Sequence, residues 1–243
     1  AAASLLSCSG EGKIDRQALV SRNNPHITEV NPLHSLNLGN GAFTLTLDAT
    51  GLQTFPEYYK DGLSLGTYSE WGWHSFPDKE GYTIEETLED HPLPGHPHGI
   101  YSVQEGLTLG QRGKAAAEWV RSNPHRMHLG NIGFAGMAPE QITDVDQTLD
   151  MWDGVLHSSF RWNGTPVKVT TVSGGDGQVL YAARISSEKA LPVVIRFPYP
   201  TGQHSDDASD WGAEDKHSTE IVSQDANSAV LKRTVDASTY YVV

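Results

Sequence analysis

The sequence has almost no cysteine and little positive charge. Cys8 is the single cysteine among 243 residues, so a disulfide framework within the chain and a four-cysteine zinc site are both excluded. Lysine and arginine number 17 against 30 aspartate and glutamate residues, and the formal net charge is −13. Nucleic-acid binding requires a concentrated basic surface, and the basic cluster Arg121, His125, Arg126 and His128 is too small to provide one. We therefore expect no nucleic-acid partner, whereas binding of neutral sugars is compatible with an acidic surface.

Long apolar runs and familiar chemical motifs are also missing. No stretch approaches the roughly 18 apolar residues that a membrane-spanning helix needs. The sequence has no Gly-x-Ser-x-Gly, no P-loop and no Gly-x-Gly-x-x-Gly after a strand. His91, His96 and His98 lie close together, but the prolines between them favour a stiff extended segment and no fourth ligand follows. We therefore expect no cofactor and no metal, and the sequence identifies no catalytic residue.

Residues 1–13 have the composition of a leader. The run Leu5-Leu6-Ser7-Cys8 resembles a bacterial lipobox, which makes Cys8 a candidate for lipidation, although the charged region that opens a signal peptide is missing. The alternative is an ordinary flexible terminus with a chance cysteine. On the first interpretation, residues 1–13 are a disordered signal or lipoprotein remnant. The protein is then secreted or held at the bacterial cell envelope, and it meets a membrane only through a lipid anchor.

The pattern from residue 14 to residue 243 predicts one all-β domain, a large antiparallel β-sandwich with a single short helix. Residues 42–48 alternate apolar and polar side chains, and Asn163-Gly164 is a strong hairpin signal. Residues 113–121 carry the strong helix formers. Further strands are expected at residues 142–150, 155–162, 166–172, 178–186, 192–197, 219–223, 229–234 and 239–243. Residues 53–101 form an unusually long irregular stretch, which indicates a functional segment or unrecognised strands.

Aromatic side chains crowd into this irregular stretch. A sugar ring has an apolar face that aromatic rings cover and a hydroxyl rim that charged and polar side chains bind. The same region, with a polar loop further along, supplies the candidates for carbohydrate binding: Glu57, Tyr58, Glu70, Trp71, Trp73, His74, Arg126 and His128. The structural alternatives are an aromatic cluster that holds down a long loop and a loop whose polar groups satisfy buried backbone groups.

With these residues set out, the chain resembles a known group. Residues 38–43, 149–156, 160–172 and 179–185 resemble strands and turns in the N-terminal β-sandwich of bacterial glycoside hydrolases and phosphorylases that carry a six-hairpin (α/α) catalytic barrel. Maltose phosphorylases and inverting α-L-fucosidases share that architecture. The resemblance implies a galactose-mutarotase-like supersandwich whose catalytic acids lie in the C-terminal barrel of the same polypeptide. It contains no catalytic signature.

The function implied by this resemblance is that of a non-catalytic domain. It would support the barrel and lend loops to the binding of carbohydrate. Two alternatives stay open: a free-standing carbohydrate-binding module, and a sugar epimerase or mutarotase-like enzyme that uses His74 or His128 beside a carboxylate in an open pocket. A third alternative is a purely structural domain without a ligand.

Overall fold

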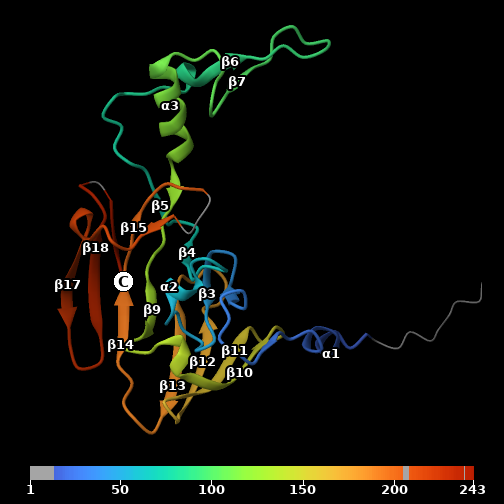
Figure 1. Cartoon of the computed structure of the whole chain (residues 1–243), viewed down its shortest axis with the longest axis vertical. Helices are drawn as coiled ribbons and strands as arrows, with labels where there is room; N and C mark the ends of the chain where they lie inside the picture. Colours follow the sequence, from blue (N-terminus) through green and yellow to red (C-terminus); the bar gives the residue numbers. More distant parts are fainter. Residues whose placement is uncertain (1–13, 205–207, 238) are drawn as a thin grey trace, which may run out of the picture.

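The computed structural model describes residues 14–204, 208–237 and 239–243, and its architecture is all-β (Figure 1). The largest sheet has five antiparallel strands in the order β1-β10-β11-β12-β13. Its strands are β1 (His26–Ile27), β10 (Ile142–Asp150), β11 (Val155–Trp162), β12 (Thr165–Ser173) and β13 (Tyr181–Ser187). Along β12 buried and exposed side chains alternate, so that one face of the sheet is apolar. The prediction of an antiparallel all-β fold is confirmed.

The described residues also form smaller antiparallel sheets. Two have three strands: β2 (Leu36–Gly39), β3 (Phe43–Leu47) and β4 (Thr67–Ser69) in one, and β17 (Ser218–Gln224), β18 (Ala229–Thr234) and β19 (Tyr240–Val242) in the other. Four are pairs: β9 (Asn131–Phe134) with β14 (Val193–Arg196), β5 (Trp73–His74) with β8 (His125–Arg126), β6 (Leu88–Asp90) with β7 (Ile100–Ser102), and β15 (Tyr199–Pro200) with β16 (Ser209–Asp210).

The described residues contain three α-helices, where the sequence predicted one. The predicted helix is present as α3 (Gln111–Ser122). The other two are α1 (Arg16–Ser21) and α2 (Pro56–Tyr59), each too short to show a periodic pattern. Asp15 caps α1 through its side chain, and Pro56 occupies the first turn of α2, where a missing N–H costs nothing. Short 3₁₀ turns are η1 (Ile84–Thr87), η2 (Pro139–Gln141) and η3 (Glu214–Lys216).

The core lies between the five-stranded sheet and the segments that cross it. Leu45 and Leu47 of β3 pack against Leu156 of β11, and all three side chains are fully buried. A second cluster joins Phe160 of β11 to Phe134 of β9. Burial of an aliphatic or aromatic side chain contributes about 1.5–3 kcal/mol, so these contacts hold the sheets face to face in a sandwich-like arrangement.

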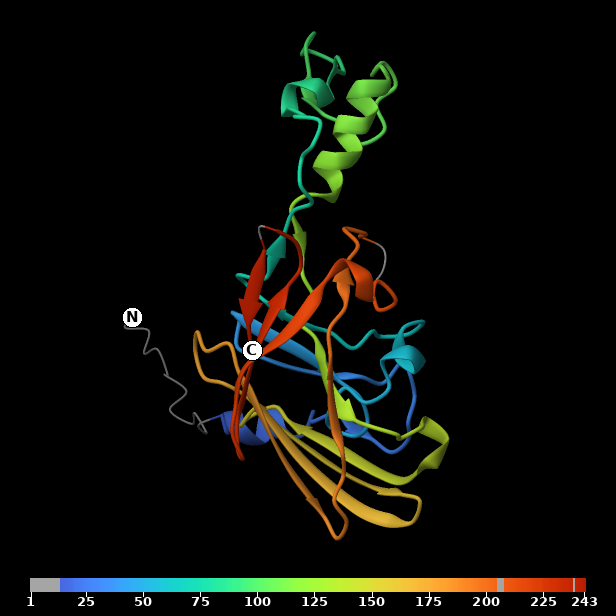
Figure 2. The same ribbon diagram turned by 90° about the vertical axis from the view of Figure 1, so that its left-hand side faces the viewer.

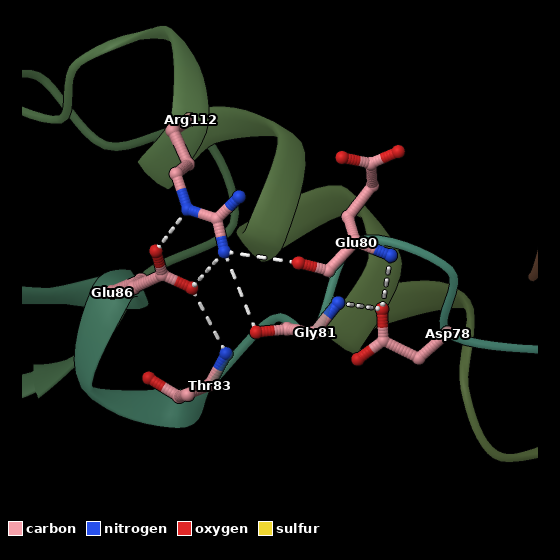
Figure 3. Close-up of polar contacts among 6 residues, drawn as sticks. All are labelled: Asp78, Glu80, Gly81, Thr83, Glu86 and Arg112. Atoms are coloured by element: carbon pink, nitrogen blue, oxygen red, sulfur yellow. Dashed lines mark hydrogen bonds and ion pairs between the residues drawn. The ribbon is translucent and has the colours of Figure 1, made fainter.

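Residues 75–124, which we call the arm, leave the sandwich after β5 and return at β8. The arm carries η1, β6, β7 and α3, and it projects well beyond the sheets in both views (Figures 1 and 2). Arg112 of α3 fastens it, because its Nε donates to Glu86 at 2.5 Å and its Nη2 to the carbonyl oxygens of Glu80 and Gly81 (Figure 3). Glu86 also accepts the backbone N–H of Thr83 at the start of η1. The long irregular stretch thus contains short strands and a separate projection.

Candidate functional site

The β5–β8 pair lies at the base of the arm and positions four of the side chains at issue. Its register places Trp73 opposite Arg126 and His74 opposite His125. Successive side chains of a strand point to opposite faces. Trp73 and Arg126 therefore face solvent, whereas His74 and His125 are buried.

Trp73 and Arg126 form an exposed aromatic and cationic surface. The Arg126 guanidinium lies 4.6 Å from the centre of the Trp73 ring, and its Nη1 donates to the carbonyl oxygen of Ser69 at 3.1 Å. Trp73 Nε1 donates to the carbonyl oxygen of Glu70 at 2.8 Å, and 46% of Trp73 is exposed. A cleft of about 440 Å³, which we call the Arg126 cleft, lies alongside, with Glu70 and Tyr68 among its lining residues. This surface unites three of the eight sequence candidates.

Trp71 faces another part of the molecule. Its ring lies 6.0 Å from that of Tyr241, and it lines an apolar groove of about 740 Å³ between β13, β14 and the C-terminal residues Val242 and Val243. The N–H of Gly72 donates to the carbonyl oxygen of Ser69, and this turn between the two tryptophans separates their directions. Trp71 and Trp73 do not form one platform.

His74 belongs to a buried chain of hydrogen bonds. Its Nδ1 lies 2.8 Å from His125 Nε2 and its Nε2 lies 2.5 Å from Asp236 Oδ2, while His125 Nδ1 donates to the carbonyl oxygen of Ser122 at 2.7 Å. The side chain of His74 is 0% exposed. His74 therefore joins the base of the arm to the turn that follows β18, and no ligand reaches it.

His128 is buried as well, with 2% exposure. Its Nε2 donates to the carbonyl oxygen of Leu65, and its Nδ1 accepts the N–H of Gly130, both at 3.0 Å. Burial lowers the pKa of His128 to about 4, so the ring is neutral at physiological pH. The edge of this ring supports Trp211 at 5.3 Å between ring centres.

Glu57 and Tyr58 lie on α2, which a buried carboxylate holds in place. Asp48 accepts the backbone N–H groups of Thr50, Thr54 and Phe55 just before the helix begins. Burial raises the pKa of Asp48 to about 6 against the opposing effect of these hydrogen bonds. Tyr58 is 44% exposed and packs edge-on against its neighbour Tyr59.

Glu57 lines a separate, more polar cavity that sequence reasoning did not identify. This cavity, the arginine cavity, measures about 510 Å³ and lies between α2, β14, β17 and β18. Its charged and aromatic lining residues are Glu57, Arg196, Phe197, Trp211, Glu214, His217 and Arg233. One signal was present in the sequence: alternation along residues 229–234 places Arg233 on the same face as Leu231, which points an arginine inward. No local pattern connects Arg233 with Arg196.

The remaining candidates give little chemistry. Cys8 lies outside the described residues. His91 and His98 contact the carboxylates of Glu89 and Asp90, and the described part of the chain has no group of three or more histidine, cysteine or acidic side chains arranged for a metal ion. None of the helices in that part is long and apolar enough to cross a membrane.

Comparison with known proteins adds no assignment to this geometry. No protein-family model matches the sequence, and no curated protein matches it significantly. The case for function therefore depends on the exposed Trp73–Arg126 surface, the Arg126 cleft, the arginine cavity and the apolar groove.

Proposed function

We propose that this chain is the non-catalytic, carbohydrate-recognising domain of a secreted or envelope-bound glycoside hydrolase. The observation that carries the proposal is the half-exposed Trp73 ring beside Arg126, Glu70 and the Arg126 cleft. An aromatic ring covers the C–H face of a sugar, while a guanidinium and a carboxylate bind its hydroxyl groups. The cleft is within the size range of small-ligand sites.

The buried histidines favour this proposal over an epimerase-like enzyme. Acid–base catalysis requires a group within hydrogen-bond reach of the substrate. His74 and His128 are each 2% exposed and use their ring nitrogens in contacts within the protein. Neither histidine is available as the acid or base in an open pocket.

The apolar groove supports the second half of the proposal, a docked catalytic barrel. Val193 and Ile195 of β14 are 46% and 42% exposed, and Val242 is 57% exposed at the same groove. A contiguous apolar surface of this kind is typical of an interaction site. We assign it to the barrel, with Trp71 as its aromatic contact, and assign the Arg126 cleft to the sugar.

Titration calorimetry of the purified chain with a panel of neutral oligosaccharides tests the carbohydrate half. We expect weak binding, with a Kd of about 1 mM, to at least one glycan. Trp73→Ala should weaken it at least about tenfold, because the stacking surface is lost. Trp152→Ala is the matched control, since Trp152 is also 46% exposed but lies in the β10–β11 turn.

Two results would reject the proposal. One is an equal loss of affinity in the Trp73 and Trp152 variants, which would show that the measured binding does not involve the Trp73–Arg126 surface. The other is turnover of a glycoside by the wild-type chain at an enzymatic rate, because a non-catalytic domain releases no reducing sugar.

A further inference from the structure

The arginine cavity contains a buried cation whose partners are all neutral. Arg233 is 1% exposed, and its guanidinium lies 4.5 Å from the centre of the Phe197 ring. Its Nη1 donates to Thr219 Oγ1 and its Nη2 donates to His217 Nδ1, each at 2.6 Å. His217 accepts this bond, so its Nδ1 carries no proton and the ring is neutral. Burial, followed by the charge of Arg233, lowers the pKa of His217, whereas Glu214 and two neighbouring aspartates oppose the shift.

A second arginine lines the same cavity. Arg196 Nη2 donates to the carbonyl oxygen of Thr54 at 3.3 Å. The Nε atoms of Arg196 and Arg233 are both buried, and neither has a hydrogen-bond partner. Among the described residues, neither guanidinium forms an ion pair with a carboxylate, whereas Arg112 and Arg161 do. Buried charges in proteins are normally paired, so two unpaired guanidiniums in one cavity point to an anion supplied from outside.

The rim of the cavity has a different character from its base. Glu57 and Glu214 line it with carboxylates, and Trp211 contributes an aromatic surface held by His128. Lys60 lies 3.2 Å from Glu57 and offsets its charge. A free inorganic anion gains nothing from these acids. A ligand with one acidic group and several hydroxyls uses both parts, because hydroxyls donate to carboxylates.

We propose that the arginine cavity binds an acidic saccharide. Its carboxylate or sulfate group contacts Arg196 and Arg233, its hydroxyls donate to Glu57 and Glu214, and its ring packs on Trp211. The oxyanion chemistry follows from the two arginines alone, and only the sugar ring draws on the proposed function. The site is separate from the Arg126 cleft and is selective for charge.

Calorimetric titration of the full chain with four probes tests this assignment: glucuronate, glucose 6-sulfate, glucose and sodium sulfate. We expect glucuronate or glucose 6-sulfate to bind at least tenfold more tightly than either glucose or sodium sulfate. The acid that binds more tightly identifies the oxyanion as carboxylate or sulfate. Its affinity should fall as salt increases, because ions screen the contact.

Three variants locate the binding. Arg233→Gln and Arg196→Gln should each lower the affinity for the acidic sugar at least tenfold. Arg161→Gln should leave it unchanged, because Arg161 pairs with Asp144 at 3.0 Å on the β10–β11 hairpin. Near-ultraviolet circular dichroism checks the fold of each variant. If Arg233→Gln does not fold, Arg196→Gln carries the test, because Arg196 is only partly buried.

The outcomes separate this proposal from the proposed function. The acidic site is overturned if neither glucuronate nor glucose 6-sulfate binds more tightly than glucose, or if the acidic sugar binds the Arg233 and Arg196 variants as well as the wild type. Sodium sulfate binding as tightly as either sugar acid overturns the saccharide assignment. If the wild-type chain binds the acidic sugar but no neutral glycan, the Arg126 cleft is rejected as a sugar site and the arginine cavity remains supported.

Discussion

Arg112 in the arm and Arg233 in the arginine cavity differ in how the protein pairs their guanidinium groups. Arg112 pairs with Glu86 and donates to two backbone carbonyls, with its side chain 55% exposed (Figure 3). Arg233 is 1% exposed and has neutral partners and an unpaired Nε. The exposed arginine is satisfied by the protein, and its role is to hold η1 against α3. The buried arginine is not satisfied, and such a group indicates a ligand.

The largest expected effect on stability comes from the backbone at Gly130, which packs against the arginine cavity. Gly130 has φ +115°, and a Cβ there would lie 2.6 Å from the Phe197 ring and 2.8 Å from the Arg196 carbonyl oxygen. Gly130→Ala should lower the free energy of unfolding by about 3 kcal/mol, since backbone strain and overpacking add. Gly136→Ala is the control, because Gly136 has φ +73° but no atom within 4 Å of the added methyl. We expect it to cost about 1 kcal/mol. If urea unfolding gave similar losses of unfolding free energy for the two variants, Gly130 would be only loosely packed against Phe197 and Arg196.

Acidification should lower the free energy of unfolding through His128, whose ring supports Trp211 at the arginine cavity. Burial lowers its pKa in the folded state to about 4 from an ordinary 6.5, so the unfolded chain binds the proton more readily between these values. The stability from neutral His128 is complete above pH 6.5 and is lost progressively as the pH falls towards 4. At pH 5 the loss should be about 2 kcal/mol relative to pH 7.5. Glutamine still donates and accepts hydrogen bonds but does not titrate. The free energy of unfolding of His128→Gln should therefore lack this part of the pH dependence. An identical pH profile for the two proteins would contradict it.

The two arginines themselves should respond differently to removal of their charge. Arg233→Met keeps an apolar contact with Phe197 and removes a buried cation, so in the absence of ligand the free energy of unfolding should fall by no more than about 1 kcal/mol or should rise. Arg112→Met should loosen the arm and increase its cleavage in limited proteolysis a few-fold, with a smaller difference at high salt. A large loss of stability in Arg233→Met would mean that the protein already satisfies this group.

Much of the sheet structure follows from local sequence. The expected bounds of β10, β11 and β18 agree with the structure, because alternation and turn residues act over a few positions. The Asn163-Gly164 hairpin has φ values of 48° and 80°, both positive as a two-residue type I′ turn requires. Strand positions are therefore readable without knowledge of the fold.

The site depends on contacts that no local pattern contains. Trp71 and Trp73 are two residues apart, yet a turn at Gly72 sends them to different surfaces. His74 meets Asp236 across 162 positions of sequence. The sequence suggested binding residues of the right kinds, but which of them share a surface was set by strand pairing and burial.

A crystal structure of the chain soaked in a glucuronate-containing oligosaccharide tests the central claim most directly. The account predicts density for a sugar ring over Trp211, with the carboxylate within hydrogen-bond distance of Arg196 and Arg233. An arginine cavity that contains no sugar at saturating ligand, or that is filled by an acidic side chain of the protein, would contradict it.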